Sequence, residues 1–357
     1  MEHGGGALPS GRLPGAGDPE SRRLHLQCLR SRLALGTDPE ALLHREEAMM
    51  EGLGACHWRW SEESREVRRL GLEAPALLFV QGEPRSRGPM VAVVGTRRPD
   101  LYGLILARTL ARVLSGAGVR VISGGALGVD AEAHRGALEG PGGTTVVLAG
   151  GLTRPHPPSN RSLFQEVLRH PAGALVSEAP MAAPPVPSSF PRRNRLIAAM
   201  ADAVVVVQAG VPSGALQTAE WARRLGVDVY AVPGDVWYER SEGCHALLRG
   251  GARPLTTPGD LARTPGLEDL RRLRWPGGGR RPSLLPPAWG DPVPGDPVPE
   301  VPVEQQNVLD ALEEGPRDPD ALGARTGLSP SLLMSALSML EIQGRVARLP
   351  GGLWVRT

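Results

Sequence analysis

Between residues 90 and 232, short runs of apolar and β-branched residues alternate with longer segments whose apolar residues recur at helical spacing. Runs this short and this continuously apolar are typical of parallel strands buried on both faces of a sheet. The alternation therefore predicts an α/β protein with a Rossmann-like, doubly wound, mostly parallel sheet of roughly six strands. The predicted strands are Met90–Val94, Val119–Ile122, Thr144–Leu148, Ala174–Ser177, Ala203–Val207 and Asp228–Val232. The predicted helices between them are Tyr102–Leu114, Val129–Leu138, Arg161–Leu168, Arg195–Ala201 and Ala215–Leu225.

The rest of the chain divides by composition. Residues 1–20 are rich in Gly and Pro and predict a disordered tail. Leucines at helical spacing predict a helical N-terminal module over residues 21–75, before a Rossmann-like domain over 76–270. We expect the module to be SAM-like or helix-hairpin-helix-like. A Pro/Gly-rich stretch predicts a linker over 271–302. Three helical patterns and two apolar runs around a Gly-Gly turn predict a winged-helix domain over 303–357.

Composition limits the kind of site that the chain can hold. The 357 residues carry 40 basic and 38 acidic side chains, so a site for a polyanion has to be a local patch. No residue is Lys, which excludes P-loop and Schiff-base lysines. Cys28, Cys56 and Cys244 lack zinc spacing, and the most apolar stretch is too short to cross a membrane. We expect a cytoplasmic protein without a metal, a cofactor or a membrane partner.

Small and basic residues gather where the first three predicted strands end. Ligands of doubly wound sheets bind outside these carboxyl ends, where Gly-rich loops and helix starts offer amides to phosphate oxygens. Phe164 lies one turn into a helix and can stack a base there. Ordinary solvated turns, and a core position for Phe164, are the alternatives. The candidate residues are Arg97, Arg98, Ser123, Gly124, Gly125, Asn160, Arg161 and Phe164.

The densest signal is the segment Phe-Pro-Arg-Arg-Asn-Arg-Leu-Ile-Ala at residues 190–198. Charge at the start of a helix favours a bound anion, although a solubility patch is the alternative. The candidates are Arg192, Arg193, Asn194 and Arg195, joined by Ser213 and Gly214 at the next small-residue helix start. Asp130 and His134 fit a structural pair better than a metal pair. No catalytic constellation stands out, so the groove is interpreted as a binding site and the protein as no enzyme.

Together these residues resemble the DNA-processing protein A family (DprA/Smf) from Met90 to about Leu261. The resemblance implies single-stranded DNA binding in the Rossmann-like groove, homodimerisation, and recruitment of the recombinase RecA in natural transformation and homologous recombination. It also implies an interplay with single-strand-binding protein. The motifs that carry it are Val94–Arg97 with Tyr102-Gly103, Ser123–His134, Asn160–Leu163, Phe190–Ala198, Ser213–Ala219, Pro233-Gly234, and Gly243–His245 with Gly251-Ala252.

The family's functional positions carry over residue by residue. The resemblance implies strand contacts at Arg97, Asn160, Arg161, Phe164, Arg193, Asn194 and Arg195, backbone donors at Ser123–Gly125 and Ser213–Gly214, and a dimer interface at Leu247, Leu248 and Leu255. Three positions depart from the family pattern: His156 stands in place of Tyr, Thr153 in place of an acidic residue, and Arg161 in place of the common Lys. Residues 331–340 hold no basic side chain, so a protein-contact role suits the winged helix better than duplex binding.

Two further functions compete with the strand binder. The first is a nucleotide-processing enzyme of the lysine-decarboxylase-like phosphoribohydrolase group, in which Glu220 would be the catalytic carboxylate. The helix start at 212–220 shares only fragments of that group's loop. The second is an interaction scaffold whose arginines serve solubility alone. Release of free base from nucleoside monophosphates would identify the enzyme, and failure to bind an oligonucleotide at low salt would favour the scaffold.

Overall fold

The computed structural model describes residues 18–30, 38–84, 88–276, 303–313, 315–342, 345–348 and 353–356. The chain forms two compact units, Met1–Arg280 and Arg281–Thr357. The predicted tail and linker lie outside the described residues, apart from 18–20 and 271–276. No helix in the described ranges is long and apolar enough to cross a membrane.

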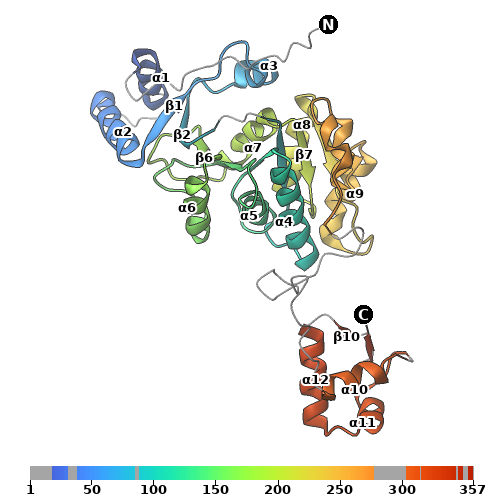
Figure 1. The fold of residues 1–357 in the computed structure, drawn as a ribbon. Helices are drawn as coiled ribbons and strands as arrows, with labels where there is room; N and C mark the ends of the chain where they lie inside the picture. Colours follow the sequence, from blue (N-terminus) through green and yellow to red (C-terminus); the bar gives the residue numbers. More distant parts are fainter. Residues whose placement is uncertain are drawn as a thin grey trace. The chain divides into compact units, whose positions relative to one another are not determined.

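Within the described residues, the first unit is built on one nine-stranded sheet (Figure 1). Its order is β1-β2-β6-β5-β4-β3-β7-β8-β9. The predicted parallel sheet is confirmed, with strand ends shifted by at most one residue. β1 and β2 extend the sheet in antiparallel fashion, and β1 lies inside the segment predicted to be only helical. The strands are β1 (Ala55–Trp58), β2 (Leu78–Gly82), β3 (Met90–Val94), β4 (Arg120–Ser123), β5 (Thr144–Leu148), β6 (Gly173–Ser177), β7 (Ala203–Val206), β8 (Asp228–Ala231) and β9 (Arg253–Pro254).

Helices cover both faces of this sheet, which explains why its strands are continuously apolar. Val91, Val93 and Val121 pack with the helices of one face, and Ala92, Val94 and Val204 with those of the other. The first face carries α4 (Leu101–Gly116), α5 (Val129–Ala137) and α6 (Arg161–Arg169); the second carries α3 (Arg65–Leu70), α7 (Ser189–Met200), α8 (Gly214–Arg224) and α9 (Glu242–Arg249).

The winding of the chain sets the position of the site. β4, β5 and β6 follow β3 outward to one side, and the chain then returns through α7 to place β7 on the other side of β3. β3 pairs in parallel with both β4 and β7. The connection after β3 therefore leads to one side of the sheet, and the connection after the neighbouring strand β7 leads to the other side. The place where two such connections part is called a topological switch point, and doubly wound sheets bind their ligands there.

The N-terminal helices α1 (Pro19–Arg30) and α2 (Pro39–Leu53) help to position the loop before α7. Glu46 of α2 is buried and accepts hydrogen bonds from the backbone N–H groups of Met181 and Ala182. Behind it, His25 and His57 are buried with 3.2 Å between His25 Nδ1 and His57 Nε2. Burial, with the charge of His25 adding to it, lowers the pKa of His57 to about 4. The neutral imidazole fits this interior.

The second unit has the winged-helix arrangement expected of residues 303–357. In the described part of this unit, three helices, α10 (Val303–Ala311), α11 (Pro319–Thr326) and α12 (Pro330–Ile342), precede the antiparallel strands β10 (Val346–Arg348) and β11 (Trp354–Arg356). Leu309, Leu337 and Trp354 share its core. The apolar side chains of Leu332, Met334 and Met339 lie exposed on α12.

Candidate functional site

The Gly-rich loop after β4 is fixed from beneath by two side chains. The carboxylate of Asp130 accepts the backbone N–H groups of Gly124 and Ala126 at 3.2 and 3.3 Å. Asn160 donates from Nδ2 to the carbonyl oxygens of Gly125 and Ala126 at 2.9 and 3.2 Å. The loop is therefore held rigidly, and the Gly124 amide is directed to Asp130 rather than toward a ligand.

Arg193 lies beneath the same loop. Its side chain is buried, and Nη1 donates to the carbonyl oxygen of Val147 at 2.6 Å. A Cβ at Gly124 would overlap the guanidinium, so only glycine leaves room for it. Burial lowers the pKa of Arg193 to about 10 against the opposing effect of Asp130, and burial also raises the pKa of Asp130. Arg193 remains a cation at neutral pH and adds positive charge to the floor of the site.

His134 completes this interior cluster. Its Nδ1 lies 2.7 Å from the hydroxyl oxygen of Thr144, and the ring is fully buried. Burial and then the charge of Arg193 lower the pKa of His134 to about 3. The imidazole is therefore neutral. Among the described residues, Asp130 bonds to the Gly-rich loop and His134 to Thr144, so the two side chains do not form the hydrogen-bonded pair that their spacing predicted.

An aromatic side chain and a guanidinium form the rim above the buried cluster. The Arg97 guanidinium carbon lies 5.4 Å from the centre of the Phe190 ring, within cation–π range. The His156 ring lies 6.2 Å from Phe190 at 71°. Arg97 is exposed and close enough to Arg193 for its charge to help lower the pKa of Arg193. Two positive charges and a partly exposed ring thus meet at the switch point.

Four arginines of this edge are exposed and have no carboxylate within ion-pair distance in the described part of the chain: Arg97, Arg98, Arg154 and Arg161. The first two follow β3, and the others lie on either side of His156 in the segment after β5. Unpaired guanidiniums keep their donors for a ligand, whereas a neighbouring carboxylate would occupy them. These four arginines and Phe190 together make up the rim, which is the positive surface of the site.

The other two arginines of α7 point elsewhere. Arg192 and Arg195 both pair with Glu178, at 2.6 and 2.7 Å, and Arg195 is buried. They line a separate 520 Å³ pocket with residues of α1 and the segment 72–77. The helix begins at Ser189 rather than at the arginines, so Arg193 lies in its second turn.

A hollow of 380 Å³ lies beside the rim, at the ends of β3, β7 and β8. Tyr102 and Tyr238 line it together with Asp100 and Asp235, and Trp237 is almost fully exposed next to it. Burial raises the pKa of Tyr102, and the charge of Asp100 adds to this effect. The two carboxylates make this hollow a poor place for a phosphate.

The structure thus separates the predicted residues into four groups. Arg97, Arg98 and Arg161 lie on the exposed rim. Ser123, Gly124, Gly125, Asn160, Phe164 and Arg193 are buried. Arg192 and Arg195 form the Glu178 cluster. Asn194 donates to the carbonyl oxygen of Gly214 at 3.3 Å, and Ser213 caps α8.

The expectation that Phe164 stacks a base is wrong. The side chain is 2% exposed, and its ring closes over Gly125, where a Cβ would lie 2.9 Å from Cε1. A buried ring offers no face to a base, so Phe190 is the aromatic residue available at the rim. Sequence reasoning missed Phe190, His156 and Arg154. The sequence did hold a signal for Phe190. The chain has only three Phe residues, and Phe79, within a strand-like run, was a clear core candidate, which left Phe164 and Phe190 as the two candidates for stacking.

The structure also shows the burial of the three leucines expected in a dimer interface and the partners of Glu220. Leu255 is 1% exposed in the chain's own core, which leaves no side-chain surface for a partner. Leu247 and Leu248 are partly exposed on α9. Glu220 pairs with Arg223 and Arg224 of its own helix at 3.1 and 3.0 Å. Within the described ranges, no group of three His, Cys, Asp or Glu residues could hold a metal ion.

Known families match both units of the chain. The family profile of the DNA recombination-mediator protein A matches residues 56–265, and that of the DprA winged helix domain matches residues 292–352. Protein Smf of Escherichia coli (strain K12) is 36% identical over 78% of this chain and 71% of its own length. A DNA processing protein DprA relative of Mycobacterium tuberculosis (strain ATCC 25618 / H37Rv) is 39% identical over 74% of this chain. The chain spans 63% of that relative's length.

Two solved structures share the fold. The DNA processing protein A of Streptococcus pneumoniae has a TM-score of 0.54 and 28% identity, and the match covers 70% of this chain and 95% of that one. The protein from Helicobacter pylori, whose structure concerns its mode of binding single-stranded DNA, has a TM-score of 0.52 and 28% identity. That match covers 58% of this chain and 94% of the other.

Proposed function

The chain belongs to the DNA recombination-mediator protein A family, and from that premise we propose that it binds single-stranded DNA at the carboxyl edge of its sheet. In this proposal the bound strand is protected and passed to the recombinase RecA, in the cytoplasm, during natural transformation and homologous recombination. The observation that carries the proposal is Arg97, unpaired within the described residues, beside the partly exposed ring of Phe190 and above the buried cation Arg193.

Charge supplies the affinity for a polynucleotide. The net charge is only +2, so general attraction to DNA is weak and the local rim has to supply the positive potential. Arg97, Arg98, Arg154 and Arg161 keep their donors free of carboxylates in the described residues. Each guanidinium that neutralises a phosphate also releases a counterion, which makes binding fall with salt.

The preference for a single strand comes from the ring at the rim. Phe190 is held between Arg97 and His156 and is partly exposed. An unpaired base can stack on such a ring, whereas a base inside a duplex has both of its faces covered. Stacking also tolerates any base, so binding is expected to be insensitive to sequence.

The buried members of the predicted site act as positioning residues. Arg193, Asn160 and Asp130 hold the Gly-rich loop and the floor under the rim through hydrogen bonds to backbone groups. Their contribution to binding is therefore geometric and electrostatic rather than by direct contact. Ser213 and Gly214 shape the start of α8 in the same manner.

Fluorescence anisotropy of labelled oligonucleotides over a salt series tests the proposal. Arg97→Ala should weaken single-strand binding and reduce the slope of log K against log salt by about 0.7, the effect of one phosphate contact. Arg223→Ala is the matched control, because this exposed arginine is paired with Glu220 on α8. A slope unchanged in Arg97→Ala, or equal losses in both variants, would remove the rim from the function.

The chain is further proposed to act as a homodimer, with Leu247 and Leu248 of α9 in the interface. Two binding edges on one dimer raise the effective concentration along a single strand. Leu248→Glu should give monomers by light scattering, with weaker binding to long strands. A variant that stays dimeric would place the interface on other residues. Single-strand-binding protein is a further proposed partner, displaced from the strand before RecA enters.

We propose binding without catalysis, because the carboxylate expected in the nucleotide-processing alternative is occupied by two arginines of its own helix. Incubation with nucleoside monophosphates, followed by chromatography for free base, tests this. Release of base that is lost in Glu220→Ala would establish the enzyme instead.

A further inference from the structure

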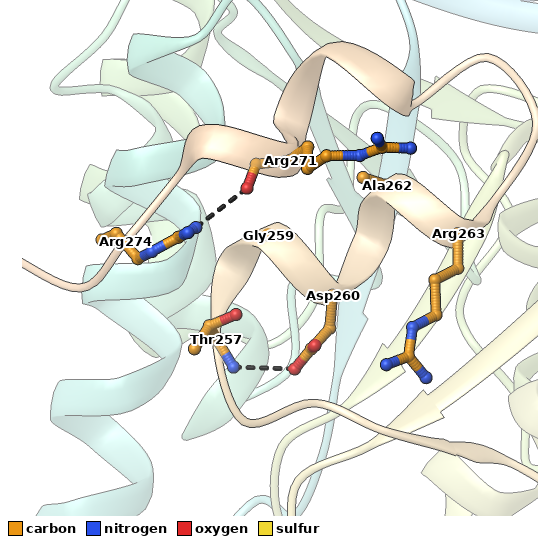
Figure 2. Close-up of a pocket in the computed structure, with 7 residues that line it drawn as sticks. All are labelled: Thr257, Gly259, Asp260, Ala262, Arg263, Arg271 and Arg274. Carbon is orange, nitrogen blue, oxygen red and sulfur yellow. Dashed lines mark hydrogen bonds between the residues drawn. The ribbon is translucent and has the colours of Figure 1, made fainter.

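A pocket of 520 Å³ lies in the segment that follows the edge strand β9 (Figure 2). It is formed by the 3₁₀ turns η4 (Pro258–Arg263) and η5 (Glu268–Arg272) and the residues after them. Three of the seven lining residues are arginines: Arg263, Arg271 and Arg274. In Figure 2, Arg263 and Arg274 lie on opposite sides of Gly259, with Arg271 on the neighbouring turn.

The single acidic residue of this pocket is already satisfied. Asp260 accepts hydrogen bonds from the backbone N–H groups of Thr256 and Thr257 at 2.7 and 2.9 Å, and from the Thr256 hydroxyl at 2.8 Å. These hydrogen bonds outweigh burial and lower the pKa of Asp260. Glu268, nearby in sequence, is likewise turned to the backbone N–H of Gly266. The local carboxylates therefore bond to the backbone and form no ion pair with these arginines in the described residues, although the charges of Arg263 and Arg271 help to lower the pKa of Asp260 and of Glu268.

The arginines of the pocket are arranged differently from ordinary surface arginines. Arg274 donates from Nη1 to the carbonyl oxygens of Arg271 and Leu273 at 2.8 and 2.9 Å, which fixes one guanidinium in place. A Cβ at Gly259 would lie 2.9 Å from the carbonyl oxygen of Arg271 and 3.1 Å from Arg274 Nη1, so glycine permits this close packing. Arg263 and Arg271 are exposed and form no ion pair within the described ranges.

The pocket begins at the same edge of the sheet as the rim. Pro254 pairs in parallel with Ala231, so Thr256 and Thr257 follow the carboxyl end of β9. The turn η4 packs against α4, and α4 begins three residues after Arg98. The indole of Trp275 lies next to the pocket and donates to the carbonyl oxygen of Thr256 at 2.7 Å. Arginines beside an aromatic ring are typical of surfaces that follow a nucleic-acid backbone.

We propose that this pocket, which we call the η4–η5 site and define by Arg263, Arg271 and Arg274, binds a phosphate oxyanion. The phosphate comes either from the backbone of a strand that extends past the rim or from free phosphate. The strand form rests on the proposed function, since it needs a polynucleotide held at Arg97 and Phe190. In this site the exposed guanidiniums of Arg263 and Arg271 contact the phosphate together with the guanidinium of Arg274, which is fixed by its backbone contacts.

The test compares a double variant with a control of equal charge change. Arg263→Ala/Arg271→Ala removes the two side chains that are not fixed by backbone carbonyls and leaves Arg274 and its backbone contacts intact. Arg223→Ala/Arg224→Ala removes two arginines whose side chains are 61% and 62% exposed but which are paired with Glu220. Both proteins and the wild type are titrated with oligothymidines of about six and about thirty nucleotides, the shorter being of the size that one module binds.

For a strand phosphate, the η4–η5 variant should keep wild-type affinity for the short oligonucleotide and lose severalfold affinity for the long one. The salt slope for the long strand should fall by about 1.4, that is by about 0.7 for each guanidinium. For free phosphate, inorganic phosphate should raise the melting temperature of the wild type and of the α8 control above the value in chloride at equal ionic strength. The η4–η5 variant should show no such rise.

The η4–η5 site is overturned if the variant behaves like the α8 control in both the long-strand and the phosphate titrations. A variant that loses dimerisation by light scattering while its salt slope is unchanged would also overturn it, since the arginines would then contact a second copy. Failure of the proposed function looks different: the wild type would bind neither oligonucleotide, and only the phosphate titration would then bear on the η4–η5 site.

Discussion

Arg193 and Arg97 lie close together at the switch point and carry the same charge, yet their surroundings differ in every respect. Arg193 is buried under a glycine, bonded to a backbone carbonyl and close to the carboxylate of Asp130. Arg97 is exposed, faces an aromatic ring and has no carboxylate partner in the described residues. The comparison teaches that a basic motif contains two kinds of arginine. The buried kind builds the site, and the unpaired kind is left for a ligand.

Replacing the buried member should have the largest effect. Arg193→Leu removes the buried hydrogen bond to the carbonyl oxygen of Val147 and the positive charge that acts on Asp130, and losing a buried hydrogen bond of a charged group costs about 3 kcal/mol. We expect the free energy of unfolding, measured with urea, to fall by that amount. Arg192→Ala is the control, because its half-exposed pair with Glu178 should contribute about 0–1 kcal/mol. Equal losses in the two variants would erase the distinction between buried and exposed arginines.

The buried cluster should also make stability depend on pH. His134 has a pKa of about 3 in the folded state, against about 6.5 when unfolded. Between pH 3 and pH 6.5, the unfolded chain therefore holds a proton on His134 that the folded chain lacks. The free energy of unfolding consequently falls as the pH drops below about 6.5. His134→Gln should reduce the difference in unfolding free energy between pH 7 and pH 5 by about 2 kcal/mol. An unchanged difference would mean that His134 is not held neutral by burial.

At the rim, Phe190→Ala should weaken single-strand binding by about 1 kcal/mol, or about fivefold. This is the lower end of the range for base stacking, because Arg97 and His156 already cover part of the ring. Phe190→Tyr keeps the face and should bind like the wild type. The loss should vanish on an abasic strand, which has no base to stack. A loss that persists there would assign Phe190 to the fold instead.

The smallest effect is expected at Arg154, which sequence reasoning missed. Arg154→Ala should lower the salt slope by about 0.7 and leave the free energy of unfolding within about 0.5 kcal/mol of the wild type. Anisotropy and urea unfolding of the same preparation measure both. A fall in the free energy of unfolding without a change in the salt slope would mean that Arg154 stabilises the fold and does not contact a phosphate.

Much of the fold was predictable because strand–helix alternation is a local pattern. The six parallel strands and the winged helix follow from it. The antiparallel strands β1 and β2 did not, since a short apolar run does not reveal its direction or its neighbour in the sheet. The start of α7 was predicted too late, because the helix was given as Arg195–Ala201 with the arginines at its start, whereas α7 begins at Ser189.

The site was predicted as a region rather than as a set of contacts. The loops that the sequence placed at one edge of the sheet do lie there, and Arg97, Arg98 and Arg161 are exposed in them. It did not reveal that Phe164 and Arg193 are buried, because burial depends on what packs against a helix face. Helical spacing did hold part of the answer: Arg192 and Arg195 are three residues apart and share a face, which Arg193 does not.

The most direct test is the structure of the full chain crystallised with a short oligothymidine. The account predicts a base stacked on Phe190, phosphates within hydrogen-bond distance of Arg97 and Arg161, and Arg193 still bonded to Val147 beneath them. Density for the oligonucleotide away from this edge, with Phe190 and Arg97 untouched, would contradict the account.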